Sequence, residues 1–273
     1  METEPVLTNL KYQLSPKTGI VSTQQTSQSV SAEADITDGK GLILTNVQIQ
    51  LIFWGTDWGA QASPSMDEVT QAVQNILSGP YMSGLAEYRG IGNGTLLEPA
   101  LASFSDPPQT FSDDDVSDLV IKLIATGIVP EPNDESQIWY CVIMPVGVSF
   151  NNPSTNGEHS FAFGVTYSFP FDVDIDKVLF AWVMNDGTPE GITTIFSHEL
   201  VESCTNPDGH GFQILPLNPN SWNEIGDACQ GKTGEVNGVT VQAYWSKTNG
   251  ACVIPGLLSP SPSGAFPYYH QKE

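Results

Sequence analysis

The stretch KVLFAWVMNDGTPEGITTIFSHELVESCT, residues 177–205, carries the strongest signals of the fold. Its first nine residues form a nearly continuous apolar run, which is typical of a strand buried on both faces. A helix is predicted from about Pro189 to Cys204, and the NPDG sequence at residues 206–209 is a strong signal for its end. A buried strand that leads into a helix favours an α/β fold.

Further strands and helices are predicted upstream of this stretch. Strands are expected at residues 42–55, 137–147 and 161–171, and helices at residues 65–77 and 113–124. This order predicts one α/β domain, with α+β as the alternative, in which a mixed sheet packs on the helix of residues 189–204. The C-terminal half is expected to be rich in loops, apart from a strand at residues 239–246.

The domain is expected to span residues 41–256. Residues 1–40 are polar and without a sustained period, which indicates an extended or partly disordered arm. Residues 257–273 are rich in Pro and Ser and are expected to form a surface tail.

Charge limits the classes of partner. The chain has 31 acidic and 9 basic residues, a formal net charge of -22. Such a surface repels phosphate backbones and anionic lipid headgroups, so we expect neither nucleic acid nor a membrane as a partner. The apolar runs are too short to span a bilayer, and the first 16 residues lack the features of a signal peptide.

Four cysteines allow three pairings if two disulfides form. We predict a disulfide between Cys229 and Cys252, which both lie in glycine-containing loop sequence, and a buried thiol at Cys141. The polar, lysine-poor composition favours a secreted or extracellular protein, although the cysteine count fits the cytoplasm equally well.

The helix of residues 189–204 also carries the main functional motif. His198 and Glu202 lie four residues apart and therefore on one helical face, where both can bind a single metal ion. Glu199, rotated away from that pair, is placed to take a proton from a water molecule at the metal. Residues 178–231 contain no Lys or Arg, so a cation would supply the missing countercharge.

This HExxE motif and the NEIGD segment at residues 223–227 resemble the gluzincins, the thermolysin-like metallopeptidases of the zincin type. The resemblance implies a zincin-like domain with zinc bound by His198, Glu202 and Glu224, and with Asp227 orienting His198. Glu202 stands where the family has its second histidine, and Asp227 follows Glu224 by three residues instead of four. The resemblance covers about forty residues, from Phe196 to about Cys229.

Two alternatives concern the metal and its third ligand. Asp208 lies ten residues after His198, the offset at which metzincins place their last ligand, and is the rival of Glu224. With two carboxylates and one imidazole, a divalent ion would acidify water less strongly than in a His/His/Glu site. Zn²⁺ is the expected metal, and Mn²⁺ or Ca²⁺ could compete for the oxygen ligands.

These residues predict a metallopeptidase that acts on a peptide or protein substrate. Glu199 would be the general base, and His210, ahead of His159 and Tyr244, would stabilise the oxyanion. The alternative is a non-catalytic zincin-like module that binds a protein or carbohydrate partner through aromatics such as Trp54 and Trp222, with a structural metal or none. The oligomeric state cannot be predicted from the sequence.

Overall fold

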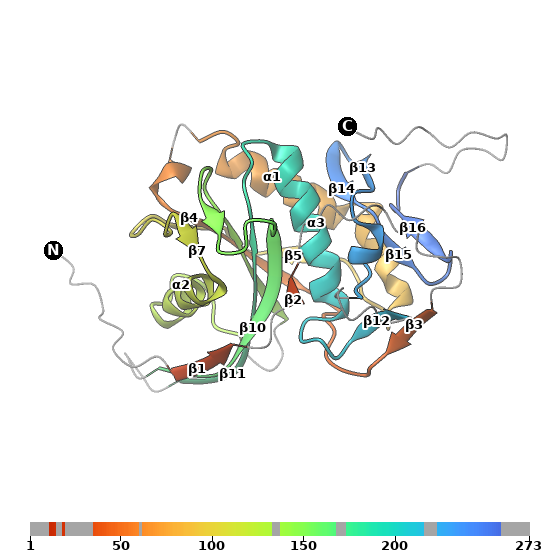
Figure 1. Cartoon of the computed structure of the whole chain (residues 1–273), viewed down its shortest axis with the longest axis horizontal. Helices are drawn as coiled ribbons and strands as arrows, with labels where there is room; N and C mark the ends of the chain where they lie inside the picture. Colours follow the sequence, from red (N-terminus) through yellow and green to blue (C-terminus); the bar gives the residue numbers. More distant parts are fainter. Residues whose placement is uncertain are drawn as a thin grey trace.

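The computed structural model describes residues 11–14, 18–19, 35–59, 62–132, 137–167, 173–215 and 223–257 (Figure 1). Of the expected N-terminal arm, three short segments are strands and residues 39–40 follow the third. The rest of the arm lies outside the described part, as do residues 258–273 of the expected tail. No helix in the described ranges is long and apolar enough to cross a membrane.

A mixed sheet with the strand order β1-β10-β11-β8-β4-β5 lies at the centre of the fold. β4, β8 and β11 are parallel neighbours, and β10 runs antiparallel to β11. The remaining strands of this sheet are short, with β1 and β2 paired to β10, and β5 and β6 paired to β4. The bounds are β1 Lys11–Leu14, β2 Thr18–Gly19, β4 Gln48–Trp54, β5 Thr95–Leu96, β6 Ala100–Ala102, β8 Ile138–Ile143, β10 Gly157–Tyr167 and β11 Val173–Val183. The predicted α/β class is confirmed.

The three central parallel strands are buried on both faces because their side chains alternate between two hydrophobic cores. In β8, Trp139, Cys141 and Ile143 point into the larger core, whereas Tyr140 and Val142 point into the smaller one. The sequence of β8, IWYCVI, is therefore apolar throughout, and β4 and β11 are mainly apolar.

Helices cover both faces of the sheet. The α-helices are α1 Met66–Ser78, α2 Asp113–Ala125 and α3 Pro189–Thr205, and the 3-10 helices are η1 Thr56–Trp58, η2 Pro80–Glu87 and η3 Asp227–Cys229. α1 and α3 contribute to the larger core, and α2 contributes to the smaller core on the opposite face (Figure 1). The acidic residues that begin α2 form a capping box, in which the side chains of Ser112 and Asp115 each accept a backbone N–H of the other residue.

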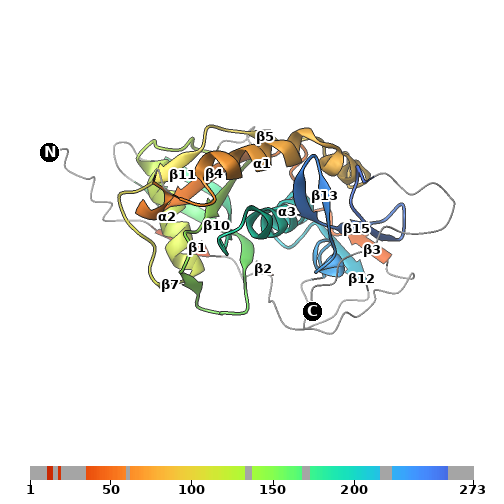
Figure 2. The ribbon, with the colours of Figure 1, turned by 90° about the horizontal axis from the view of Figure 1, so that it is seen from above.

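Small two-stranded sheets complete the fold. They pair β3 Asp35–Asp38 with β12 Phe212–Leu215, β7 Thr110–Phe111 with β9 Ser149–Phe150, β13 Thr233–Val236 with β14 Val239–Gln242, and β15 Tyr244–Ser246 with β16 Ala251–Val253. α3 lies between the central sheet and the C-terminal strands (Figures 1 and 2). The predicted single strand at residues 239–246 is wrong in one respect, because Ala243 interrupts it by donating its N–H to the carbonyl of Lys232.

The predicted disulfide between Cys229 and Cys252 is present, and it joins η3 to β16. Cys141 and Cys204 are free and buried, as predicted for Cys141. A disulfide in this position is compatible with an extracellular protein.

Candidate metal centre

Helix α3 brings the HExxE motif into the interior of the protein. Its N-terminus is capped by Thr188, whose hydroxyl accepts the backbone N–H of Gly191 at 3.0 Å, and Pro189 occupies the first turn. Every residue from Phe196 to Thr205 is buried, because β10 lies against one side of the helix and β14 against another. The polar side chains of this segment are therefore held in a site that is nearly free of solvent.

One set of possible ligands gathers around His159 of β10. Its Nδ1 lies 3.1 Å from Glu199 Oε2 and 3.8 Å from Glu202 Oε2, and its Nε2 lies 3.6 Å from Glu224 Oε1. Asn206 holds Glu224 in place by donating its Nδ2–H to Glu224 Oε1 at 2.6 Å. Ligand atoms of His159, Glu202 and Glu224 lie within 4.8 Å of one another, a separation that one metal ion can span.

A second set gathers around His198. Its Nε2 lies 3.1 Å from Glu202 Oε1 and 3.8 Å from Asp227 Oδ1. The backbone N–H of Asp227 donates to Glu202 Oε1 at 2.9 Å, and Gln242 Nε2 contacts His198 Nδ1. His198, Glu202 and Asp227 likewise offer ligand atoms within 4.8 Å of one another, so Glu202 belongs to both sets.

Several pKa values in this cluster are raised because buried carboxylates lie close together. Burial, followed by the charges of Glu224 and Glu199, raises the pKa of Glu202 well above its usual range. Burial and then the charge of Glu202 raise the pKa of Asp227 in the same direction. Burial alone would lower the pKa of His159, but Glu224 and Glu199 outweigh it and raise that pKa well above the ordinary value. Each of these shifts reflects an excess of negative charge in a buried place.

Several polar atoms of the cluster lack a hydrogen-bond partner within the described part of the chain. They are His198 Nε2, Glu199 Oε1, Glu224 Oε2 and Asp227 Oδ2, all of them inaccessible to solvent. Buried polar atoms are normally paired, and buried charges are normally neutralised by a partner or a metal. The ion pairs recorded for these carboxylates are all with histidines and none is with Lys or Arg. The residues present therefore fit a divalent cation.

The structure brings most of the sequence-predicted site residues together. His198 and Glu202 lie side by side on one face of α3, and Asp227 lies beside His198 as expected. Glu224 is also in the cluster, but it belongs to the set around His159 and not to the set around His198.

Two predicted residues lie elsewhere. Asp208, the alternative third ligand, forms an ion pair with Lys177, in which Nζ lies 2.7 Å from Oδ2. The side chain of His210, the first choice for stabilising the oxyanion, is 78% exposed and contacts Asp208. Neither residue belongs to a possible ligand set in the described part of the chain.

Three members of the cluster have roles that the sequence does not predict. The sequence suggests His159 only as an oxyanion donor and Asn206 only as part of the signal that ends the helix, and it predicts no role for Gln242. His159 lies 39 residues before His198 in the sequence, counted as 198 minus 159, so no local spacing links the two. The one available signal was the pair Glu158-His159 at the start of a strand, since polar residues there face either solvent or a site.

Two glycines allow the cluster to be this compact. A Cβ atom at Gly226 would lie 2.7 Å from Glu202 Oε1 and 3.0 Å from His198 Nδ1. A Cβ atom at Gly157 would lie 2.8 Å from Glu199 Oε1 and would collide with Ile195. Side chains at these positions would displace residues of the cluster, so the absence of a side chain is needed for close approach.

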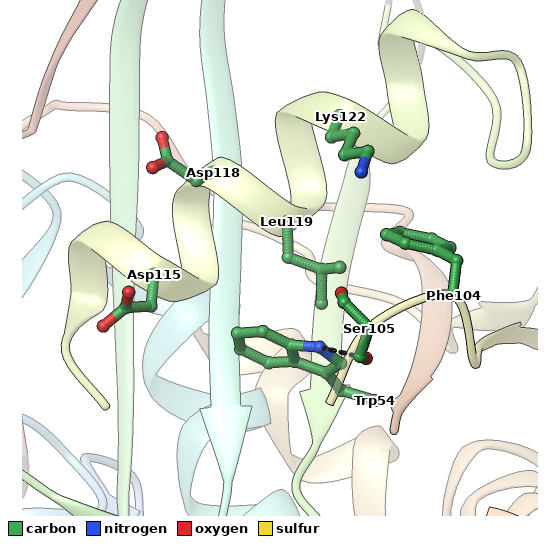
Figure 3. A pocket seen from close by; sticks show the side chains of 7 residues that line it. All are labelled: Trp54, Phe104, Ser105, Asp115, Asp118, Leu119 and Lys122. Carbon is green, nitrogen blue, oxygen red and sulfur yellow. Dashed lines mark hydrogen bonds between the residues drawn. The ribbon is translucent and has the colours of Figure 1, made fainter. Parts of the chain in front are cut away.

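Aromatic residues that could serve a binding module are mostly in the core. Trp54, Trp58, Tyr244 and Trp245 are buried, and Trp222 lies outside the described residues. A pocket of about 180 Å³ lies beside α2, lined in part by Trp54, Phe104 and Lys122 (Figure 3). Lys122 Nζ stacks on the ring of Phe104 at 4.3 Å, and Trp54 Nε1–H donates to the carbonyl of Ser105. Lys122 and Trp54 thus each contact another residue of the pocket wall, which also contains Asp115 and Asp118.

Comparison of the chain with protein-family models, with curated proteins and with solved structures gives no match.

Proposed function

We propose that this protein is a divalent-metal-dependent hydrolase, and that its substrate is a peptide or protein. The observation that carries the proposal is the convergence of His159, Glu202 and Glu224 in a buried place where, among the described residues, they form no ion pair with Lys or Arg. An imidazole and two carboxylates suit Zn²⁺, and Mn²⁺ accepts the same ligands. A divalent cation bound there would polarise a substrate carbonyl and make water more acidic.

The side chains around this set have separate roles in the proposal. Glu199 Oε2 accepts the Nδ1–H of His159, which leaves the Nε2 lone pair of the ring facing Glu224. Glu199 Oε1 has no hydrogen-bond partner among the described residues and serves as the proton acceptor for water and the proton donor to the leaving amine. Glu199 thus both orients a ligand and carries the proton. Asp227, 15% exposed, marks the side of the cluster nearest to solvent.

The experiment is casein cleavage by the full chain, with the metal content measured for each variant. Glu199→Gln should keep the metal and lose activity by at least about 100-fold, because a general base contributes about that factor or more. Glu190→Gln is the matched control, since Glu190 lies in the exposed first turn of the same helix. Cleavage that survives Glu199→Gln would overturn the assignment of Glu199 as the base.

A structural metal in a non-catalytic module is the second candidate. It is favoured by burial, since His159, Glu199, Glu202 and Glu224 are each at most 2% exposed. Wild-type protein that contains metal and cleaves neither casein nor short peptides would favour this second function over the first.

We also propose that the protein is extracellular. The disulfide between Cys229, which is buried, and Cys252 supports this location, and so does the low content of Lys and Arg. Labelling of free thiols in protein taken from its native source tests it. A freely reactive thiol pair at Cys229 and Cys252 would contradict it.

A further inference from the structure

The two carboxylate oxygens of Glu202 face two different histidines. Its Oε2 is turned toward His159, at 3.8 Å from Nδ1, while its Oε1 is turned toward His198, at 3.1 Å from Nε2. The two oxygens of one carboxylate therefore face the histidines of the two different ligand sets. Carboxylates in this position bridge the paired ions of two-metal hydrolases, which lie about 3.5–4 Å apart.

We propose that the centre holds two divalent cations, the second bound by His198, Glu202 and Asp227, with Glu202 as the bridge. This inference rests on the proposed function, because it extends the metal site of the same hydrolase. The two sets are His159, Glu202 and Glu224 on one side, and His198, Glu202 and Asp227 on the other.

Two buried atoms in the second set lack a hydrogen-bond partner among the described residues, and this points to a ligand. His198 is fully buried, and its Nε2 lacks a hydrogen-bond partner in the described part of the chain while facing Glu202 and Asp227. Asp227 Oδ2 is a second buried atom without such a partner. A buried imidazole nitrogen that faces two carboxylates and has no hydrogen bond among the described residues is suited to share a cation with them.

Gln242 influences which ring nitrogen of His198 carries the proton. Its amide contacts His198 Nδ1, and its Nε2 also donates to the carbonyl of Gly226 at 3.1 Å. A half-turn of the amide, which gives up the hydrogen bond to the carbonyl of Gly226, would place its oxygen toward His198, so that Nδ1–H donates and the Nε2 lone pair faces the second cation. A ligating histidine is usually held in this way by an acceptor on its other nitrogen.

Charge balance favours two ions over one. Glu199, Glu202, Glu224 and Asp227 carry four negative charges when ionised, and two divalent cations neutralise four. One cation would leave two buried negative charges, and the recorded ion pairs of these residues include no Lys or Arg. Uncompensated charge of this kind is strongly unfavourable in the interior.

The experiment measures how many ions the full chain binds. Protein stripped with a chelator is titrated with Zn²⁺ by calorimetry, and the bound metal is counted by elemental analysis. We expect two ions per chain for the wild type, and one each for Asp227→Asn and His159→Gln. Asp208→Asn is the matched control and should keep two ions, because Asp208 is paired with Lys177 outside both sets.

A second measurement reports on the bridge. Loading with Mn²⁺ should produce the electron paramagnetic resonance spectrum of a coupled pair, which Asp227→Asn should convert to that of an isolated ion. Circular dichroism of each variant verifies that it is folded. A wild-type stoichiometry of one, or a stoichiometry of two that Asp227→Asn leaves unchanged, would overturn the inference.

The outcomes separate this inference from the proposed function. One ion per chain with casein cleavage would remove the second cation and leave the hydrolase. Two ions without cleavage of any peptide would retain the dinuclear centre and remove the peptidase. Protein that binds no Zn²⁺ would overturn both.

Discussion

Glu202 is the residue on which the cluster depends most. It is buried, accepts the backbone N–H of Asp227, and contacts both His159 and His198. Burial, and then the charges of the neighbouring Glu224 and Glu199, raise its pKa. In the proposed function, the same carboxylate is unfavourable in the metal-free protein and is a ligand in the metal-bound one.

The variant Glu202→Gln should separate these two effects. We expect the metal-free variant to be at least as stable as the metal-free wild type, because the amide removes a repelled charge of similar size. Wild-type protein should gain about 2.7 kcal/mol from Zn²⁺ at a free concentration about 100 times the Kd, and the variant should gain little. Thermal unfolding with and without Zn²⁺ measures both quantities. An equal gain in both proteins would contradict the role of Glu202 as a ligand.

Gly226 should tolerate no side chain. A methyl group there would press on Glu202 Oε1 and His198 Nδ1, so Gly226→Ala should weaken Zn²⁺ binding by at least about tenfold, as changes beside metal ligands commonly do. Gly92→Ala is the control, because the nearest atom to its added Cβ is 3.5 Å away. Calorimetric titration of both variants measures the difference. Unchanged binding by Gly226→Ala would show that the cluster can yield at this point.

At the scale of elements, helix ends follow closely from the sequence. α1 and α2 begin with the same capping box, in Ser65 with Glu68 and in Ser112 with Asp115. These caps depend on residues three positions apart, so local chemistry is enough to predict where the helices start. Strand starts are harder to predict, since β10 begins at Gly157 and not at residue 161 as expected. Because β10 begins at Gly157, the strand includes His159.

Removing one cap should affect stability without affecting metal binding. Ser112→Ala leaves N–H groups of the first turn of α2 without an acceptor and should lower the free energy of unfolding by about 1 kcal/mol. Ser65→Ala should have a similar effect on α1, and Zn²⁺ affinity should be unchanged in both. Urea denaturation monitored by circular dichroism tests this. A loss of metal affinity in Ser112→Ala would mean that α2 is coupled to the centre across the sheet.

At the scale of the whole molecule, the C-terminal strands close the site against α3. η3 carries Asp227 and ends at Cys229, which the disulfide ties to Cys252. The segment that supplies Glu224 and Asp227 is thus tied at Cys229 to a cysteine 23 residues further along the sequence. A restraint of this kind limits the freedom of the unfolded chain and fixes the ligand loop in the folded one.

Loss of the disulfide should therefore have two effects. Replacing Cys229 and Cys252 together by Ser should lower the free energy of unfolding by about 3 kcal/mol, the value typical of a closed loop of this length. Zn²⁺ affinity should fall as well, because Asp227 lies two residues from Cys229. A reductant should lower the unfolding midpoint of the wild type and leave that of the double variant unchanged. An unshifted wild type would contradict a structural role for the bond.

The sequence by itself determined the main helices and strands, and it determined one half of the candidate metal centre, the pair His198 and Glu202. Period-two and helical patterns, caps and the NPDG stop are local, so they predicted the α/β class, α3 and the pairing of His198 with Glu202 one turn later. Only the tertiary structure decided that His159 of β10 joins Glu224, and that Glu224 lies apart from the set around His198. The physical reason is that strand pairing and helix packing bring together side chains far apart in sequence, and no local pattern records that distance.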